Sequence, residues 1–262
     1  MNLVDVKVHA PTATILMDRR DVGNALDEQL IEELSQALDD LHQEKKVRAV
    51  VLTGAGDDFC LGMDLQELHA HTAIDEIAAM PLWIEHWDRL GGLIEKFLRF
   101  PKPIIAAVDG KAHGAGFTLA LAADMVVASR SAEFGASPIR RGMVGGVLAP
   151  LLTFRLGSSI ATRLLLTGEI LSSRQAYRCG MISKRVTSNQ IWVAANELAK
   201  TCAAWPATPL AVTKRLLNET IGEAVLTQIS VGAAAGATAC STATAAEGLK
   251  AFAENRDPVW PH

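Results

Sequence analysis

The chain has 262 residues, of which 49% are hydrophobic and 21% are charged, and its formal net charge is −4. This composition is typical of a globular protein with enough apolar side chains for one large core, and it excludes a disordered or fibrous chain. The slightly negative charge provides no basic field for nucleic acid or for an anionic membrane surface, so neither is expected as a partner.

The N-terminal part alternates predicted strands and helices. Residues 12–17 are β-branched and apolar and predict a strand. Asp27 then precedes a helix whose apolar residues recur at spacings of three and four. Residues 47–53 predict a buried strand that ends in the turn 54–56.

A second unit of the same kind follows. Residues 83–97 carry apolar side chains at helical spacing and predict an amphipathic helix that stops before Pro101. Residues 103–108 predict a strand, and residues 117–123 predict a helix after a glycine-rich turn. Beyond residue 128 the pattern is mostly helical, in the ranges 151–166, 190–202, 209–217 and 223–252.

Composition and spacing give no sign of a metal, a disulfide or a membrane segment. The four cysteines are far apart, with no CxxC pair and no histidine at zinc-site spacing, so we expect reduced core thiols and no bound metal. Residues 1–11 lack the pattern of a signal peptide, and no apolar run approaches the roughly 20 residues that span a bilayer. We therefore expect a soluble cytoplasmic protein.

Two glycine-rich turns, residues 59–65 and 110–117, are the most informative local features. Glycine permits unusual backbone dihedrals, and the start of a helix leaves N–H groups without acceptors, so such turns can direct N–H groups at an anion. Neither turn matches the GxGxxG dinucleotide pattern or the GxxxxGK[ST] phosphate loop. A nucleotide-binding protein is therefore not expected.

With their flanking sequence, the two turns resemble the crotonase (enoyl-CoA hydratase/isomerase) superfamily over nearly the whole chain. The matching segments are DRRDVGNAL (18–26), VVLTGAGDDFCLGMDL (50–65), PIIAAVDG (103–110), AAD (122–124), AEFG (132–135), LTG (166–168) and residues 176–182. The resemblance implies an α/β fold, with a spiral of repeated ββα units over residues 1–200. It also implies a C-terminal helical region, residues 201–262, that builds a trimer and contributes to the coenzyme A pocket.

The resemblance further implies that the substrate is an acyl-CoA thioester. No cofactor is then bound permanently, because coenzyme A is part of the substrate, and the expected assembly is a homotrimer or a dimer of trimers. The oxyanion hole of the family corresponds to the backbone N–H groups of Met63 and Ala115. Two fixed donors of this kind favour the enolate of a thioester.

Coenzyme A contacts carry over in the same way. The resemblance implies that the backbone near Ala25, Gly62, Asp64 and Leu65 holds the adenine end. Phe252 is expected to pack on it, with ordinary helix packing as the alternative.

The sequence does not decide which cationic side chain binds the phosphates of coenzyme A. The family often has a lysine three residues after this phenylalanine, but here the residue is Asn255, followed by Arg256. Arg19 and Arg20 are alternative cations.

The catalytic carboxylates of the family are missing. The two glutamate positions fall on Thr118 and Pro138, and a later carboxylate position falls near Gly145 and Gly146. None of these side chains can act as a general acid or base near neutral pH. The two-glutamate hydratase mechanism and the one-glutamate isomerase mechanism are therefore not available.

Other residues are candidates for the missing roles. His113, beside the second turn, is the candidate acid or base. Arg140 and Arg141 either bind a carboxylate of the acyl group or lie on the surface. Further candidates lie on the segment that covers the pocket in this family: His69, His71, Glu76, Glu85 and His86. The expected substrate pocket contains Thr118, Pro138, Gly146 and Arg140.

Three functions stay open from the sequence. The first is an enzyme that works through an oxyanion-stabilised enolate, nominally an enoyl-CoA hydratase or isomerase. The second is a catalytically inactive protein that binds acyl-CoA. The third is a decarboxylase of a malonyl-type thioester, in which Arg140 orients the leaving carboxylate.

Overall fold

The computed structural model describes residues 2–136 and 138–261, except for the side chains of residues 76 and 221. The strands are β1 (Val4–His9), β2 (Thr12–Met17), β3 (Ala49–Gly54), β4 (Ile104–Val108), β5 (Lys111–His113), β6 (Met125–Ser129), β7 (Glu133–Gly135), β8 (Ile170–Ser172) and β9 (Lys184–Val186). They form a six-stranded sheet in the order β1-β2-β3-β4-β6-β9 and a three-stranded sheet in the order β5-β7-β8.

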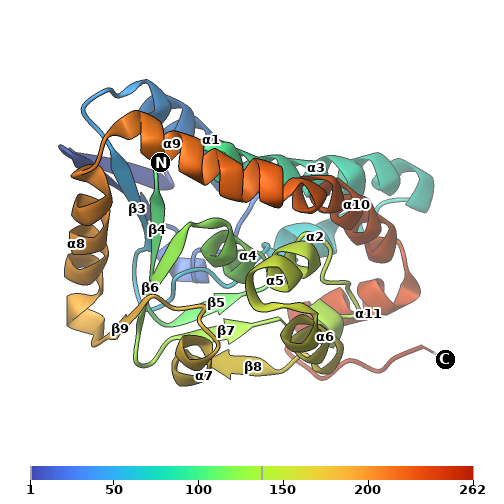
Figure 1. Ribbon diagram of the computed structural model, residues 1–262. Coiled ribbons are helices and arrows are strands. Elements are labelled where there is room, and N and C mark those ends of the chain that lie inside the picture. The colour runs from blue at the N-terminus through green and yellow to red at the C-terminus, as the bar shows by residue number, and fades with distance from the viewer. Residues whose placement is uncertain (1, 137, 262) are drawn as a thin grey trace.

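Helices surround both sheets (Figure 1). They are α1 (Glu28–Gln43), α2 (Leu65–His71), α3 (Glu76–Arg99), α4 (Ala115–Ala122), α5 (Leu148–Leu156), α6 (Ser158–Thr167), α7 (Ser173–Arg178), α8 (Ile191–Ala203), α9 (Ala207–Arg215), α10 (Glu223–Cys240) and α11 (Ala243–Ala253). Short helical turns are η1 (Arg20–Val22), η2 (Pro138–Arg141), η3 (Ser188–Gln190) and the π-helix η4 (Leu216–Ile221).

The large sheet is buried on both faces, which is why its central strands are continuously apolar. Successive side chains of a strand point to opposite faces, so Val50 and Leu52 of β3 join the main core with α1, α3 and α4. Val51 and its neighbour Ile105 on β4 point the other way and pack against α8. From β2 onward the pairs β2-β3-β4-β6-β9 are all parallel.

The C-terminal helices turn back over the core (Figure 1). α10 lies along α3, and α11 lies against α2 and η2. The close α3–α10 approach depends on small residues, because a Cβ at Gly236 would lie 2.6 Å from the Trp87 ring. The predicted boundary at residue 200 falls inside α8.

Several helices differ from the sequence prediction. The range 151–166 contains two helices, because Gly157, with φ of 81°, ends α5 and begins α6. The range 223–252 contains α10 and α11, which are bent by 75° relative to each other, with the Thr242 hydroxyl capping α11. α2 was not predicted at all; its seven residues are too few for a helical period to be evident.

No single helix in the described part of the chain is both long and apolar enough to cross a membrane.

Candidate active site

A cavity of about 1010 Å³ lies where the two glycine-rich turns meet α3, η2 and α11. All but two of the site residues predicted from the sequence line it: Ala25, Gly62, Met63, Asp64, Leu65, His113, Ala115, Thr118, Pro138 and Phe252. Over the described residues, no group of three or more His, Cys, Asp and Glu side chains is placed to hold a metal ion.

The two turns are joined through their backbones. The Cys60 amide donates to the Lys111 carbonyl and the His113 amide donates to the Cys60 carbonyl, both at 3.0 Å. A Cβ at Gly116 would lie 2.1 Å from the Cys60 carbonyl oxygen, so this contact requires glycine. Gly62 has φ of +107°, a conformation that glycine adopts without strain.

The amides of Met63 and Ala115 are two free donors of the site in the described part of the chain. The backbone groups next to Met63 are hydrogen-bonded to Leu26: the Leu26 amide donates to the Gly62 carbonyl, and the Asp64 amide donates to the Leu26 carbonyl. Ala115 is the first residue of α4, where amides have no acceptor within the helix. Neither amide has a hydrogen-bond acceptor within residues 2–136 and 138–261, and both residues line the cavity.

The positions of the missing carboxylates lie beside an apolar part of the cavity. The Thr118 hydroxyl donates to the Gly114 carbonyl at 3.1 Å, so its proton is already used inside α4. Pro138 begins η2. The neighbouring lining residues are mostly apolar: Trp87, Leu90, Met143, Val144, Gly145, Val147 and Leu148.

His113 lies at the end of β5, with its ring against β7. A Cβ at Gly135 would lie 2.7 Å from ring atom Cδ2, so the absence of a side chain there makes room for the imidazole. Burial lowers the pKa of His113, although the charge of Glu133 opposes this shift. Its Nε2 is buried and has no hydrogen-bond partner among the described residues. The imidazole is therefore neutral at pH 7.

The other proposed acid and base residues do not line the cavity. His86 is 5% exposed, and burial together with the charges of His71 and Arg89 lowers its pKa to about 4. The Glu85 carboxylate pairs with Arg89 at 2.8 Å. The remaining two histidines, His69 and His71, lie on α2, and the side chain of Glu76 lies outside the described residues.

Two of the predicted pocket residues, Arg140 and Gly146, do not line this cavity. Arg140 is exposed and lies against Gly168, whereas Arg141 lines the cavity. η2 has about three residues per turn, so consecutive side chains point about 120° apart and only one of the two arginines can face inward. Gly146 packs against the backbone of α10, where a Cβ would lie 2.7 Å from the Gly232 carbonyl oxygen.

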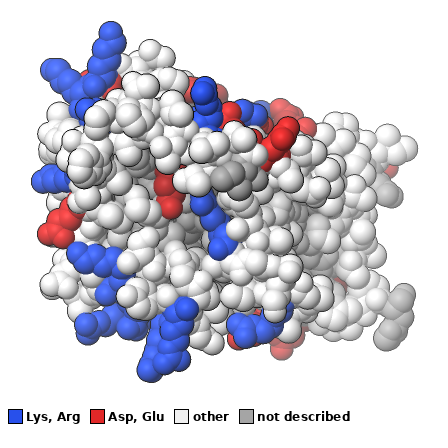
Figure 2. All heavy atoms as spheres, viewed as in Figure 1, with Lys and Arg blue, Asp and Glu red and all other residues white. Residues whose placement is uncertain are grey.

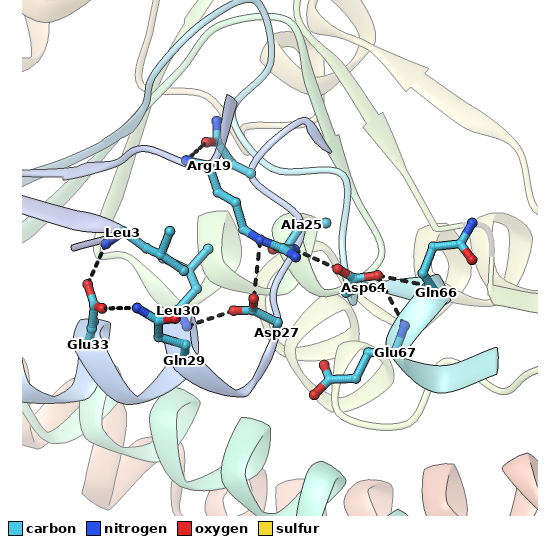
Figure 3. Close-up of polar contacts among 11 residues, drawn as sticks. Leu3, Arg19, Ala25, Asp27, Gln29, Leu30, Glu33, Asp64, Gln66 and Glu67 are labelled. Atoms are coloured by element: carbon cyan, nitrogen blue, oxygen red, sulfur yellow. Dashed lines mark hydrogen bonds and ion pairs between the residues drawn. The ribbon is translucent and has the colours of Figure 1, made fainter. Parts of the chain in front are cut away.

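Arg19 organises one wall of the cavity (Figure 3). Its guanidinium lies 2.6 Å from Asp64 and 3.2 Å from Asp27, and it donates to the Ala25 carbonyl at 2.9 Å. Asp27 and Asp64 are the N-caps of α1 and α2, so this arginine links the starts of two helices. Burial disfavours the Asp64 carboxylate, but Arg19 and two backbone amides outweigh it and hold the pKa below its usual value. Arg19 is therefore already paired and is not a free cation for phosphate.

Sequence reasoning gave Trp87 no role in the cavity, and it left open whether Arg141 binds substrate or lies on the surface. Trp87 is 7% exposed and belongs to the apolar stripe of α3, so helical spacing alone assigned it to the core. The repeated arginine at 140–141 was the available signal for Arg141, but choosing between the two required the geometry of η2.

Comparison with known proteins identifies the family to which the chain is similar. The family model for enoyl-CoA hydratase/isomerase matches residues 8–262. The chain is 30% identical to the 1,2-epoxyphenylacetyl-CoA isomerase of Escherichia coli, over 98% of each protein. It is 35% identical to the mitochondrial enoyl-CoA hydratase domain-containing protein 2 of Bos taurus, over 94% of this chain and 83% of that one.

A solved structure gives the same result for the fold. The enoyl-CoA hydratase/isomerase of Pseudoalteromonas atlantica matches with a TM-score of 0.85 and 26% identity, over 99% of this chain and 100% of that one. The resemblance predicted from the two glycine-rich turns is confirmed, and the chain belongs to the enoyl-CoA hydratase/isomerase family of the crotonase superfamily.

Proposed function

We propose that the protein binds an acyl-CoA thioester in this cavity and stabilises its enolate with the amides of Met63 and Ala115. One observation carries the proposal: two amides that have no acceptor among the described residues lie on turns that are fixed to each other and line the same cavity. Donors held in place before the reaction stabilise a developing oxyanion without reorganisation, which is why they lower a barrier.

The side chains around the cavity favour a reaction that moves a single proton. Hydration by carboxylates at the catalytic positions of the family has no support, because Thr118, Pro138 and Gly145 at those positions carry none. His113 is the one imidazole that lines the cavity within the described residues, and it is neutral at pH 7. A single base that removes a proton and returns it at another carbon performs an isomerisation. The similar Escherichia coli protein is named as an isomerase, which supports this order of preference.

Replacement of Ala115 by proline tests the enolate step, because proline removes one N–H group yet is tolerated at the first position of a helix. Bound acetoacetyl-CoA should show enolate absorbance with the wild type and with Ala115→Gly, which retains the amide. Ala115→Pro should lose most of this signal, and any turnover should fall about 100- to 1000-fold, as for loss of one oxyanion donor. An unchanged enolate signal in a folded Ala115→Pro variant would contradict the proposal.

Binding of acyl-CoA without turnover is the second candidate, favoured by the buried Nε2 of His113, which faces β7. A panel of short and medium enoyl-CoA substrates, followed by the absorbance of the conjugated thioester, separates the two. Turnover that falls with His113→Ala supports the enzyme, whereas binding with no turnover supports the second candidate. Decarboxylation is the third candidate, for which Arg141 rather than Arg140 is the cation that lines the cavity; release of carbon dioxide from malonyl-CoA would support it.

A further inference from the structure

Coenzyme A carries phosphate groups, yet the lining of the cavity has more acids than bases. The acidic lining residues are Asp21, Asp57, Asp58, Asp64 and Glu133, and the basic ones are Arg20, Lys111 and Arg141. A phosphate in such surroundings needs a cation that is not already neutralised by a carboxylate.

Most of the arginines suggested by the sequence are already paired. Arg256, which follows Asn255, lies 2.6 Å from both Glu247 and Glu254. Arg20 makes two hydrogen bonds to Asp18, at 2.7 and 2.6 Å. Arg19 holds the helix caps described above. None of these three guanidinium groups is available without breaking an existing pair.

Arg141 differs from them in its surroundings. Its guanidinium carbon lies 5.0 Å from the centroid of the Phe252 ring, and both residues are half-buried in the cavity lining. No carboxylate or hydrogen-bond acceptor in the described part of the chain contacts this guanidinium. A guanidinium stacked on a ring keeps its N–H donors free at the edge of its plane, where a phosphate can bind to two of them at once.

The backbone fixes Arg141 relative to Phe252. A Cβ at Gly248 of α11 would lie 2.1 Å from the Arg141 carbonyl oxygen, and a Cβ at Gly142 would lie 2.2 Å from the Thr244 carbonyl oxygen. The backbone at residues 141 and 142 is therefore in close contact with α11 at residues 244 and 248, ahead of Phe252. Such preorganisation reduces the entropy lost when an anion binds.

We infer that Arg141, stacked on Phe252, binds a phosphate group of coenzyme A and supplies a cation at this end of the cavity. The inference rests on the proposed function, because it assigns a role within the same cavity. It also gives Phe252 a role that ordinary helix packing does not, since its ring holds the guanidinium in place.

Calorimetric titration of acetyl-CoA into the wild type, Arg141→Gln and Arg140→Gln tests the inference. Both variants lose one positive charge from adjacent residues, but only Arg141 lines the cavity. Arg141→Gln should weaken binding about tenfold or more, as expected for loss of a charge-assisted contact, and Arg140→Gln should stay within about twofold. Unfolding midpoints of the two variants confirm that each is folded. Equal effects of the two substitutions would overturn the inference.

Three further ligands identify the anion. S-acetylpantetheine, which has no phosphate, should bind the wild type and Arg141→Gln equally. The second comparison uses 3′-dephospho-acetyl-CoA. If the wild type and Arg141→Gln bind it with equal affinity, Arg141 contacts the 3′-phosphate; if the variant still binds it more weakly, Arg141 contacts the diphosphate. Either result supports the inference. An effect of Arg141→Gln on malonyl-CoA but not on acetyl-CoA would assign an acyl carboxylate instead and overturn it. If the wild type binds no coenzyme A species, the proposed function fails first.

Discussion

Single buried side chains decide how this protein responds to pH. Three atoms without hydrogen-bond partners among the described residues lie on α2 and α3: Glu67 Oε2, His71 Nδ1 and His86 Nε2. His86 is the most deeply buried of these residues, so it stays neutral in the folded protein well below the pH at which an exposed histidine gains a proton.

Acid should therefore destabilise the fold through His86. Its pKa is about 4 in the folded protein against 6.5 for an ordinary histidine, so the unfolded chain binds the proton first and stability falls as pH decreases from about 6.5 to 4. The contribution of this residue between pH 7 and pH 5 is about 2 kcal/mol. Urea unfolding at both pH values should show a smaller loss for His86→Leu than for the wild type. His9→Leu, an exposed site on β1, should leave the loss unchanged. Equal losses in all three proteins would contradict the assignment.

At this scale the sequence identified the backbone donors but not the side chains around them. Met63 and Ala115 follow from two motifs, since a backbone position depends only on register. The choice of Arg141 over Arg140, and the exclusion of His86 from the cavity, depend on the direction of a side chain in a short helical turn and on the packing of α3. Neither the direction of a side chain in a short helical turn nor the packing of α3 produces a periodic pattern in the sequence.

Among the secondary-structure elements, α1 and α2 are held together at their first residues rather than along their lengths. The carboxylates of Asp27 and Asp64 each cap one helix and share Arg19 (Figure 3). Both side chains are mostly buried, at 20% and 12% exposed, so loss of the cation would leave two charges in a poorly solvated place.

Arg19→Met should therefore destabilise the protein by about 2 kcal/mol at pH 7, less than a fully buried pair would because water still reaches the site. Arg20→Met is the matched control, because its pair with Asp18 is exposed, and it should leave stability nearly unchanged. The pKa of Asp64 is lowered in the fold, so its contribution to stability is lost as pH falls through that value. The difference between the wild type and Arg19→Met should shrink toward pH 3. A constant difference would contradict the role of the pair.

The elements themselves were predicted well where periodicity is long and poorly where a single residue ends a helix. The strands at 12–17 and 103–108 and the helix after Asp27 agree with β2, β4 and α1. The break at Gly157 and the bend before α11 depend on local dihedrals and on packing against η2, which a helical apolar pattern does not encode.

For the whole molecule, an apolar groove lies on the face formed by α5, α6 and α10. It has a volume of about 730 Å³ and includes Leu166 and Val231, which are 70% and 56% exposed. Figure 2 shows charged side chains gathered toward the α8 side of the molecule, whereas the side of α10 and α11 is mostly uncharged. Exposed apolar surface of this kind is typical of a protein interface.

The homotrimer or hexamer implied by the family resemblance stays a prediction, and this groove is the surface on which to test it. Light scattering should give three or six times the chain mass of 28.0 kDa. Leu166→Glu should lower the mass, because a charge would enter an apolar contact. Val193→Glu, at an exposed position on α8 away from the groove, should not. A monomeric wild type would contradict the prediction.

The proposed use of backbone donors also determines which substitutions the protein tolerates. In this proposal Met63 and Ala115 act through their N–H groups, so in a saturation library any side chain that fits their buried surroundings should support function, and proline should not. Intolerance should appear at their neighbours instead, since any side chain at Gly116 meets the Cys60 carbonyl and Gly62 has a left-handed backbone. Selection on this site would then be visible as fixed glycines around residues that vary only within the volume available to them.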